Sequence, residues 1–411
     1  MDFSDLDLNK PILKAIFEKN YESPTEIQEK TIPLVLAKKD LIATAQTGTG
    51  KTAAFILPIL QLLFHNKNDA ENTKNIRGLI VSPTRELAVQ INEECIAFSK
   101  YTGLKSTVVY GGTSINAQEK ILNEGIDILI ATPGRLLDLC DQEIIDLSAV
   151  EILVLDEADL MLDMGFIDDV KKINRLCSQE KQVLLFSATM PYKVMRFAER
   201  ILTDPVRIEI EPEIRSSKKL KQYLYYVSKT DKVELCLHLL RNTIQGNILI
   251  FRRTRNGVDR LEQTLLKNGF KAEGLHGDKA QSVRQNILDN FKYDKINILI
   301  ATDVASRGID IDDLDAVLNF DLPNIPETYV HRIGRTGRAG KSGASFSFCA
   351  PDEKEYVSGI QKLIKSAIPV VEDHPCSVIA KEKPKQDNTK RTKHKKSRKS
   401  AASKKNKKRW Y

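Results

Sequence analysis

Short runs of aliphatic and β-branched residues alternate with longer amphipathic stretches from Asp40 onward, and this alternation constrains the fold more than any other feature. Apolar runs bounded by polar segments are typical of buried parallel strands that are each followed by a helix. The pattern predicts two doubly wound α/β sheets in series. The predicted strands are LIATA, GLIVS, TVVY, IDILIA, EILVL and VLLFS in the first half, and YLYYV, NILIF, INILIA, AVLNF and ASFSF in the second.

The alternation pauses at a polar stretch over residues 208–221 and then resumes. We therefore predict a first lobe over residues 1–207, a linker over residues 208–217 and a second lobe over residues 218–372. A length of 411 residues fits about two such domains. Residues 373–411 are rich in Lys, Ser and Asn, a composition too polar to fold, so a disordered basic tail is expected.

The net charge of +8 is distributed unevenly along the chain. Residues 381–411 contain 15 Lys and Arg against 2 Asp and Glu, a net of +13, whereas the remainder carries −5. Such a lysine run is either a solubilising segment or an arm that binds nucleic acid, and we favour the arm. The longest apolar stretch, residues 53–64, is broken by Pro58 and Gln61 and is too short to cross a bilayer.

The six cysteines are far apart, with neither a CxxC spacing nor a histidine at metal-ligand spacing. This pattern argues against a zinc site or a disulfide framework, and reduced core thiols are expected. The N-terminus is acidic and lacks a secretion signal. We expect a cytoplasmic protein with no membrane contact.

The segment AQTGTGKT connects a predicted strand to a predicted helix. Backbone N–H groups at such a position surround phosphate oxygens, with Lys51 neutralising the β and γ phosphates and Thr52 holding Mg²⁺. The common phosphate-loop pattern has glycine where this chain has Ala45. The predicted phosphate-binding residues are Ala45, Gln46, Thr47, Gly48, Thr49, Gly50, Lys51 and Thr52.

Carboxylates follow another predicted strand, EILVL, at the sheet edge where open α/β folds bind ligands. Asp156 suits a metal ligand, directly or through water, and Glu157 suits the base that orients or deprotonates the attacking water. An acidic strand end alone is often only a solvated loop. Its pairing with the phosphate loop favours a nucleotide site.

Asp156 to Asp159 spell DEAD, and this motif occurs with YESPTEIQ, AQTGTGKT, PTRELA, the pair Gly111 and Gly112, TPGR, SAT, ATDVASRGID and HRIGRTGR. In these motifs and their order, the chain resembles the DEAD-box RNA helicases from Phe3 to about Ile368. LDMGF and LPNIPETYVHRIGRTGRAG resemble the bacterial RhlE-type subgroup most. The resemblance implies two tandem RecA-like lobes, each a mostly parallel sheet flanked by helices, with ATP and Mg²⁺ as cofactors.

The resemblance also implies how the nucleotide is held. Gln28 would read the adenine edge, an upstream aromatic would stack on the ring, and arginines of the second lobe would reach the γ-phosphate. Two departures occur: Asn20 replaces the usual glycine, and Leu160 follows the DEAD motif where arginine is common. Asparagine tolerates positive φ, so the turn should survive. The implied residues are Phe3, Tyr21, Thr25, Gln28 and Asp303 for the nucleoside, and Arg335 and Arg338 for catalysis.

RNA is implied to lie against loops that follow strands of both lobes, through contacts to the sugar-phosphate backbone that carry no sequence information. The implied RNA-binding residues are Thr84, Arg85, Gly112, Thr132 and Arg135 in the first lobe, and Arg253, Thr254, Gly277, Thr302 and Arg307 in the second. The residues implied to couple the lobes are Ser187, Thr189, Gln281, Arg284 and His331.

Two alternatives stay open from the sequence: a DNA helicase built on the same motor, and an ATP-gated RNA clamp with little unwinding. SPTEIQ, PTRELA and the spelling DEAD disfavour the first. We expect a monomer that acts on single strands and short duplexes of RNA, with ribosome precursors or an RNA decay complex as candidate partners.

Overall fold

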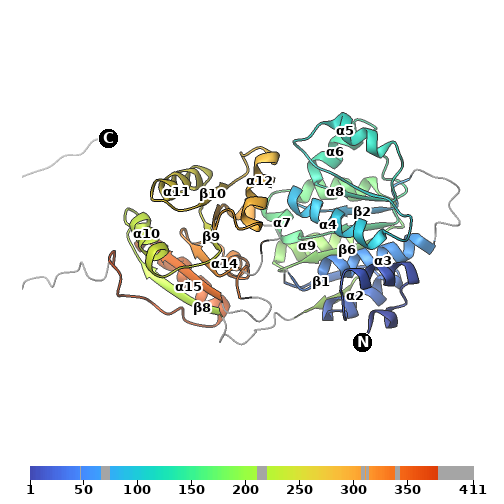
Figure 1. Ribbon diagram of the computed structural model, residues 1–411. Helices are drawn as coiled ribbons and strands as arrows, with labels where there is room; N and C mark the ends of the chain where they lie inside the picture. The colour runs from blue at the N-terminus through green and yellow to red at the C-terminus, as the bar shows by residue number, and fades with distance from the viewer. Residues whose placement is uncertain are drawn as a thin grey trace, which may run out of the picture.

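The computed structural model describes residues 1–46, 48–65, 75–210, 220–306, 311, 314–337 and 343–377, and these form two separate sheets (Figure 1). The first sheet contains β1 (Leu41–Thr44), β2 (Gly78–Val81), β3 (Ser106–Val109), β4 (Ile128–Ala131), β5 (Ile152–Leu155), β6 (Gln182–Ser187) and β7 (Val206–Glu209). The second contains β8 (Leu220–Tyr226), β9 (Ile248–Phe251), β10 (Ala272–Leu275), β11 (Ile298–Ala301), β12 (Ala316–Asn319) and β13 (Gly343–Cys349).

Strand order is β3-β4-β2-β5-β6-β1-β7 in the first sheet and β10-β11-β9-β12-β13-β8 in the second. Neighbouring strands of both sheets pair in parallel. The predicted fold, two tandem RecA-like α/β lobes, is therefore confirmed. All carboxyl ends of the strands in one sheet lie at one edge, where ligand-binding loops gather.

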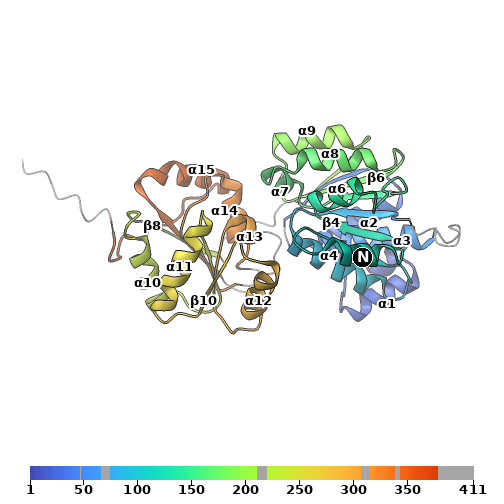
Figure 2. The ribbon, with the colours of Figure 1, turned by 90° about the horizontal axis from the view of Figure 1, so that it is seen from above.

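Helices connect the strands and cover both faces of each sheet (Figure 2). The first lobe contains η1 (Phe3–Leu6), α1 (Lys10–Glu18), α2 (Glu26–Leu36), α3 (Lys51–His65), α4 (Arg85–Ser99), α5 (Ile115–Leu122), α6 (Pro133–Asp141), α7 (Ala158–Asp163), α8 (Ile167–Leu176) and α9 (Tyr192–Ile201). The second contains α10 (Lys232–Asn242), α11 (Arg255–Lys267), α12 (Gln281–Lys292), α13 (Asp303–Ser306), α14 (Pro326–Ile333), η2 (Pro351–Glu353) and α15 (Lys354–Ile364).

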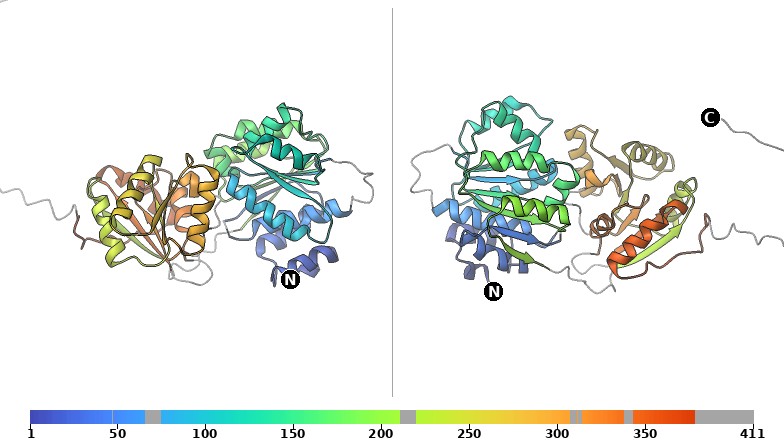
Figure 3. Two further views of the ribbon diagram at one scale, coloured as in Figure 1. Left: turned by 45° about the horizontal axis from the view of Figure 1, so that its top comes forward. Right: turned by 180° about the vertical axis from the view of Figure 1, so that it is seen from behind.

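The core of the first lobe is divided by the period-two geometry of its strands. On β6, Leu184 and Phe186 pack beneath α1 to α4, whereas Val183 and Leu185 pack beneath α6 to α9. Strands buried on both faces read as continuous apolar runs, which explains why they were recognisable in the sequence. The two helical layers are visible on opposite sides of the sheet in Figure 3.

The second lobe repeats this arrangement. On β9, Ile248 and Ile250 pack with α10 and α11, whereas Leu249 and Phe251 pack with α12. A further cluster lies between the sheet and the helices α14 and α15. Among the described residues, each apolar cluster stays within one lobe.

Only the first three residues of the segment expected as a linker, 208–210, are described. β7 continues the first sheet to Glu209, two residues into that segment, and residues 211–219 lie outside the described ranges. The described second lobe extends to Ser377, which pairs with Val227, so it continues five residues into the segment 373–411 that was expected to be a disordered tail. The basic stretch of residues 381–411 is outside the described ranges. No helix in the described ranges has the length and apolar character that a bilayer crossing requires.

Candidate active site

The predicted phosphate loop connects β1 to α3 at the carboxyl edge of the first sheet. Gly50 has a φ of +92°, and a Cβ there would lie 2.5 Å from Nε2 of Gln28, so glycine is required. Within the loop, Oγ1 of Thr49 donates to the carbonyl of Gln46 at 2.8 Å. Thr47 lies outside the described residues. The loop leads directly into the first turn of a 15-residue helix, whose N-terminal amides suit phosphate oxygens.

Lys51 is buried at the start of α3. Its Nζ donates to the carbonyl of Ala45 at 2.9 Å and lies 3.3 Å from Oε1 of Glu157. Burial lowers the pKa of Lys51, but the carboxylates of Glu157, Asp156 and Asp159 outweigh burial and raise it overall. The site therefore contains a fixed ammonium charge with carboxylates on one side, an environment ready to receive phosphate anions and a divalent cation.

Asp156 and Glu157 follow β5, as the sequence predicts. Asp156 is 3% exposed, and its Oδ1 has no hydrogen-bond partner among the described residues. Burial and the neighbouring Glu157 raise the pKa of Asp156 to about 7, against the opposing effect of Lys51. A buried, unpartnered carboxylate oxygen near the phosphate loop fits a Mg²⁺ ligand. Thr52, the second residue of α3, supplies the predicted hydroxyl on the same edge.

Glu157 adopts a left-handed backbone, with φ 57° and ψ 52°, at the N-terminus of α7. Such a conformation is costly for a residue with a side chain and is often found at functional sites. It turns the chain sharply between β5 and α7 while the Glu157 carboxylate stays beside Lys51. The predicted base and the predicted phosphate ligand are thus brought together.

Asp159 connects the nucleotide side of the first lobe to the second lobe. Its Oδ2 accepts from the backbone N of Thr189 at 2.9 Å and from Oγ1 of Thr189 at 2.8 Å, and its own N–H donates to Oγ of Ser187 at 3.2 Å. Burial raises the pKa of Asp159, but His331 of the second lobe and Lys51 lower it to below its usual value. The DEAD and SAT motifs therefore share one carboxylate, and the charge of His331 in α14 acts on it.

A second meeting point between the lobes lies on Glu86, which sequence reasoning missed. Its buried carboxylate accepts from Nε2 of Gln281 at 2.9 Å and pairs with Nη2 of Arg284 at 3.0 Å. Burial lowers the pKa of Arg284, and Glu86 opposes that shift. Glu86 lies in the PTRELA motif, next to Arg85, and this position in a motif is the sequence feature that could have identified it as a functional residue. The contact joins α4 of the first lobe to α12 of the second.

Asp303 and the arginines of the HRIGRTGR motif lie in the second lobe. Both carboxylate oxygens of Asp303 accept from Arg332, the second at 2.7 Å, so the residue expected at the ribose is held by a neighbour that the sequence did not single out. Arg332 also donates to Asn319 at 3.1 Å. Arg335 follows α14 and is buried. Arg338 lies outside the described residues, so its catalytic role stays a prediction.

The residues expected at the adenine lie together beside α2. Gln28 caps that helix by accepting from Thr25 N at 3.0 Å, and its Nε2 donates to the carbonyl of Gly50 at 3.1 Å, which ties α2 to the phosphate loop. Phe3 is only 3% exposed and lies 6.3 Å from the Tyr21 ring. Stacking of a base on Phe3 stays a prediction. Asn20 has a φ of +57°, which confirms the expected turn.

The first-lobe residues expected at RNA lie in the loops after β2, β3 and β4 or in the first turn of the helix that follows. Oγ1 of Thr84 caps α4 by accepting from Leu87 N at 3.3 Å. Gly112, with φ +86°, lies against Arg85, since a Cβ there would be 2.6 Å from Nη1. Arg135 donates to Oε1 of Gln118 at 2.7 Å, and Thr132 precedes α6. Arg85, Gly112 and Thr84 are thus contiguous, and their contact with RNA stays a prediction.

The second-lobe residues expected at RNA follow β9, β10 and β11. Thr254 caps α11 by accepting from Gly257 N at 3.1 Å, and Arg253 precedes it. Gly277 lies beside Arg255, since a Cβ added at Gly277 would be 3.8 Å from Nη2 of that arginine. Thr302 follows β11, and Arg307 lies outside the described residues.

Fold and site together define a class of protein: a two-lobed P-loop nucleoside triphosphatase, in which a phosphate loop and carboxylates of one RecA-like lobe meet polar residues of another. Two family descriptions match the chain, "DEAD/DEAH box helicase" over residues 25–197 and "Helicase conserved C-terminal domain" over residues 231–340. The chain belongs to the DEAD-box family of ATP-dependent RNA helicases.

Individual relatives and solved structures support the same family assignment. The chain is 42% identical over 370 residues to the DEAD-box ATP-dependent RNA helicase RhpA of Helicobacter pylori, covering 90% of this chain and 74% of that protein. It is 42% identical over 363 residues to the DEAD-box ATP-dependent RNA helicase CshA of Bacillus subtilis, covering 88% and 72%. Among solved structures, Saccharomyces cerevisiae Dbp5 bound to RNA and ADP BeF3 matches with a TM-score of 0.80 and 31% identity, covering 90% and 95%.

Proposed function

We propose that this chain hydrolyses ATP where its two lobes meet, and uses the cycle to separate short RNA duplexes locally or to remodel RNA–protein complexes. The observation that carries the proposal is the carboxylate of Asp159. It accepts a hydrogen bond from Thr189 in the first lobe, and the charge of His331 in the second lobe lowers its pKa. Because the charge of Asp159 interacts both with Lys51 at the phosphate loop and with His331 of the second lobe, ATP binding and lobe closure are coupled. Backbone-directed contacts make RNA binding independent of sequence.

We assign the chemistry as follows. Lys51 would bind the β and γ phosphates, while Thr52 and the unpartnered oxygen of Asp156 would hold Mg²⁺. The ion, when bound, neutralises charge on the phosphates. Glu157 orients and deprotonates the attacking water, and Arg335 with Arg338 stabilises the charge that develops on the phosphoryl group. Hydrolysis then requires closure, because the arginines belong to the second lobe.

The finer placement of the protein is also a proposal. LDMGF and LPNIPETYVHRIGRTGRAG support the RhlE-type subgroup, and the free thiols of the cysteines support a reducing compartment, the cytoplasm. We propose lobe boundaries near residues 207 and 218, a monomeric enzyme, and ribosome precursors or an RNA decay complex as partners. Residues 381–411, with a net charge of +13, would raise the local concentration of RNA.

The test is the variant Glu157→Gln, which keeps shape but removes the base. ATP turnover in saturating RNA should fall about a hundredfold or more, the usual contribution of such a group. RNA affinity in the presence of ATP should rise, because without hydrolysis the closed, RNA-bound state does not reopen. Glu180→Gln, an exposed residue of the same lobe, serves as the matched charge control and should behave like the native protein. Unchanged turnover in Glu157→Gln would remove the residue from the mechanism.

A strand-displacement assay with matched RNA and DNA duplexes checks the use of the energy. We expect displacement of a short RNA duplex that requires ATP and is lost in Lys51→Ala. ATP turnover and RNA binding without displacement would indicate the clamp, and displacement of the DNA duplex alone would indicate the DNA motor.

A further inference from the structure

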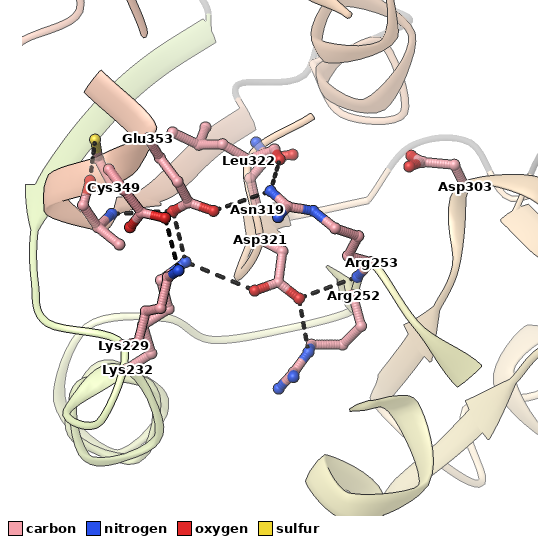
Figure 4. Close-up of polar contacts among 12 residues, drawn as sticks. Lys229, Lys232, Arg252, Arg253, Asp303, Asn319, Asp321, Leu322, Cys349 and Glu353 are labelled. Atoms are coloured by element: carbon pink, nitrogen blue, oxygen red, sulfur yellow. Dashed lines mark hydrogen bonds and ion pairs between the residues drawn. The ribbon is translucent and has the colours of Figure 1, made fainter. Parts of the chain in front are cut away.

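A cluster of charged side chains, most of them buried, lies in the second lobe (Figure 4). Glu353, at the end of η2, is nearly fully buried, as is Lys232 of α10. Oε2 of Glu353 accepts from Nζ of Lys232 at 2.9 Å and from the backbone N of Ala350 at 3.0 Å. Buried charges are retained only when they are paired and hydrogen-bonded, so the position of this carboxylate is well determined.

The other oxygen of Glu353 faces Arg253. Oε1 accepts from Nη2 of Arg253 at 2.9 Å, and the same nitrogen donates to the carbonyl of Leu322 at 2.9 Å. Asp321 holds the backbone of the same arginine, since its Oδ2 accepts from Arg253 N at 3.0 Å. Arg253 is therefore fixed at two points, its main chain and one edge of its guanidinium.

Asp321 has a second task in the cluster. Its carboxylate forms ion pairs with two further cations, Nε of Arg252 at 3.0 Å and Nζ of Lys232 at 3.6 Å. Burial raises the pKa of Asp321, but Arg252 and the backbone N–H of Arg253 outweigh burial and hold the pKa below its usual range. Arg252 also lies 4.1 Å above the Phe320 ring. Asp321 is therefore an ionised anchor.

The charges in this cluster do not cancel. Lys232, Arg252 and Arg253 carry three positive charges against two on Asp321 and Glu353. Four of the five side chains are less than one fifth exposed, whereas that of Arg253 is 51% exposed. The cluster therefore has a net positive charge, and its one solvent-exposed cation is Arg253. Within the described part of the chain, its Nη1 and Nε have no hydrogen-bond partner, which leaves donors for an anion.

Arg253 lies in the turn between β9 and α11, directly before Thr254, at the carboxyl edge of the second sheet. We propose that Glu353 is a positioning residue for RNA binding, which holds one edge of the Arg253 guanidinium so that the other edge meets a backbone phosphate of RNA. The inference rests on the proposed function, in which Arg253 contacts RNA. A guanidinium held in advance loses less conformational entropy when it binds phosphate.

The test depends on the direction in which RNA affinity changes. Removing the Glu353 carboxylate makes the lobe more positive, so electrostatic attraction alone predicts tighter RNA binding by Glu353→Gln. Positioning predicts weaker binding. With full-length protein, a single-stranded oligouridine and a non-hydrolysable ATP analogue, we expect the affinity of Glu353→Gln to fall about three- to tenfold, the size of one charge-assisted contact. Affinity for the ATP analogue without RNA should not change.

A double-mutant cycle separates positioning from a general effect on the fold. Arg253→Ala should weaken RNA binding and flatten its dependence on log salt by about 0.7, the value for one phosphate contact on a single strand. In the Arg253→Ala background, Glu353→Gln should cause no further loss. A loss of the same size in both backgrounds would overturn the proposal. Asp352→Asn, which makes the same change of charge at the exposed neighbour of Glu353, is the matched control and should bind RNA at least as tightly as the native protein.

Glu353→Gln leaves Lys232 without its closest partner and can prevent folding. Lys232→Met/Glu353→Gln removes both buried charges, conserves net charge and still removes the charge on the acceptor that holds Arg253, so it should bind RNA more weakly than the native protein. If this folded variant binds RNA with native affinity while Arg253→Ala binds RNA weakly, the positioning role of Glu353 is refuted but the contact of Arg253 with RNA is not. Native affinity in Arg253→Ala would instead refute the contact of Arg253 with RNA.

Discussion

At the scale of single residues, the fully buried Asp156 makes the nucleotide site sensitive to pH. Its pKa of about 7 means that the carboxyl is largely protonated below pH 7 until a cation binds. A raised pKa also means that ionisation of this group costs folding stability as the pH rises through 7, a cost that a bound cation removes. The carboxyl is thus better suited to a site that holds a cation than to one that does not.

We predict that binding of magnesium ATP releases a proton from Asp156. The affinity should be constant above pH 8 and fall towards tenfold per pH unit below 7, because the ionised carboxylate is the ligand. Calorimetric titration in buffers of different ionisation enthalpy measures the proton. Asp156→Asn supplies the control for protonation of ATP itself. A pH profile shared by the native protein and this variant would contradict the prediction.

At the scale of elements, α4 and α12 are joined through Glu86. We predict that Glu86→Gln raises the RNA concentration needed for half-maximal ATP turnover about tenfold, since loss of a charged partner for buried Arg284 costs roughly 1–3 kcal/mol. Turnover in RNA-stimulated ATPase assays gives the readout. The exposed Glu93→Gln on the same helix is the matched control. Equal effects of Arg284→Met in native and Glu86→Gln backgrounds would show that the pair is not coupled.

The elements also show what sequence could and could not predict. Central strands such as β5 were recognisable because burial on both faces makes them continuously apolar. Two edge strands were not predicted: β7 reads VRIE with alternating exposure, and β10 reads AEGL with a glycine and a charge. Such strands form because a neighbouring strand offers hydrogen bonds, which no local pattern reveals.

The same distinction applies to the site. Lys51, Asp156 and Glu157 could be predicted because each belongs to a short motif next to its own strand. Glu86 and Glu353 could not be assigned their contacts, since their partners Gln281 and Arg253 lie 195 and 100 residues away along the chain. Only the fold brings such pairs together.

At the scale of the whole molecule, a slightly acidic body is combined with a strongly basic C-terminal stretch. We predict that deletion of residues 381–411 weakens RNA affinity and flattens its dependence on log salt, by about 0.7 for each RNA phosphate that the tail neutralises. ATP turnover in saturating RNA should stay near the native value. A tail of permuted sequence but the same composition should restore both properties. Equal salt slopes with and without the tail would refute a role as an RNA-binding arm.

The joint between the lobes has a further consequence. Its described side-chain contacts are polar, from Gln281 and Arg284 to Glu86, and each apolar cluster of the described residues is complete within one lobe. Opening the joint therefore replaces these contacts with water and uncovers none of those clusters. In the proposed cycle, in which the lobes open once for every ATP consumed, the movement can therefore repeat many times without exposing a surface on which other proteins, or a second copy of the chain, would aggregate.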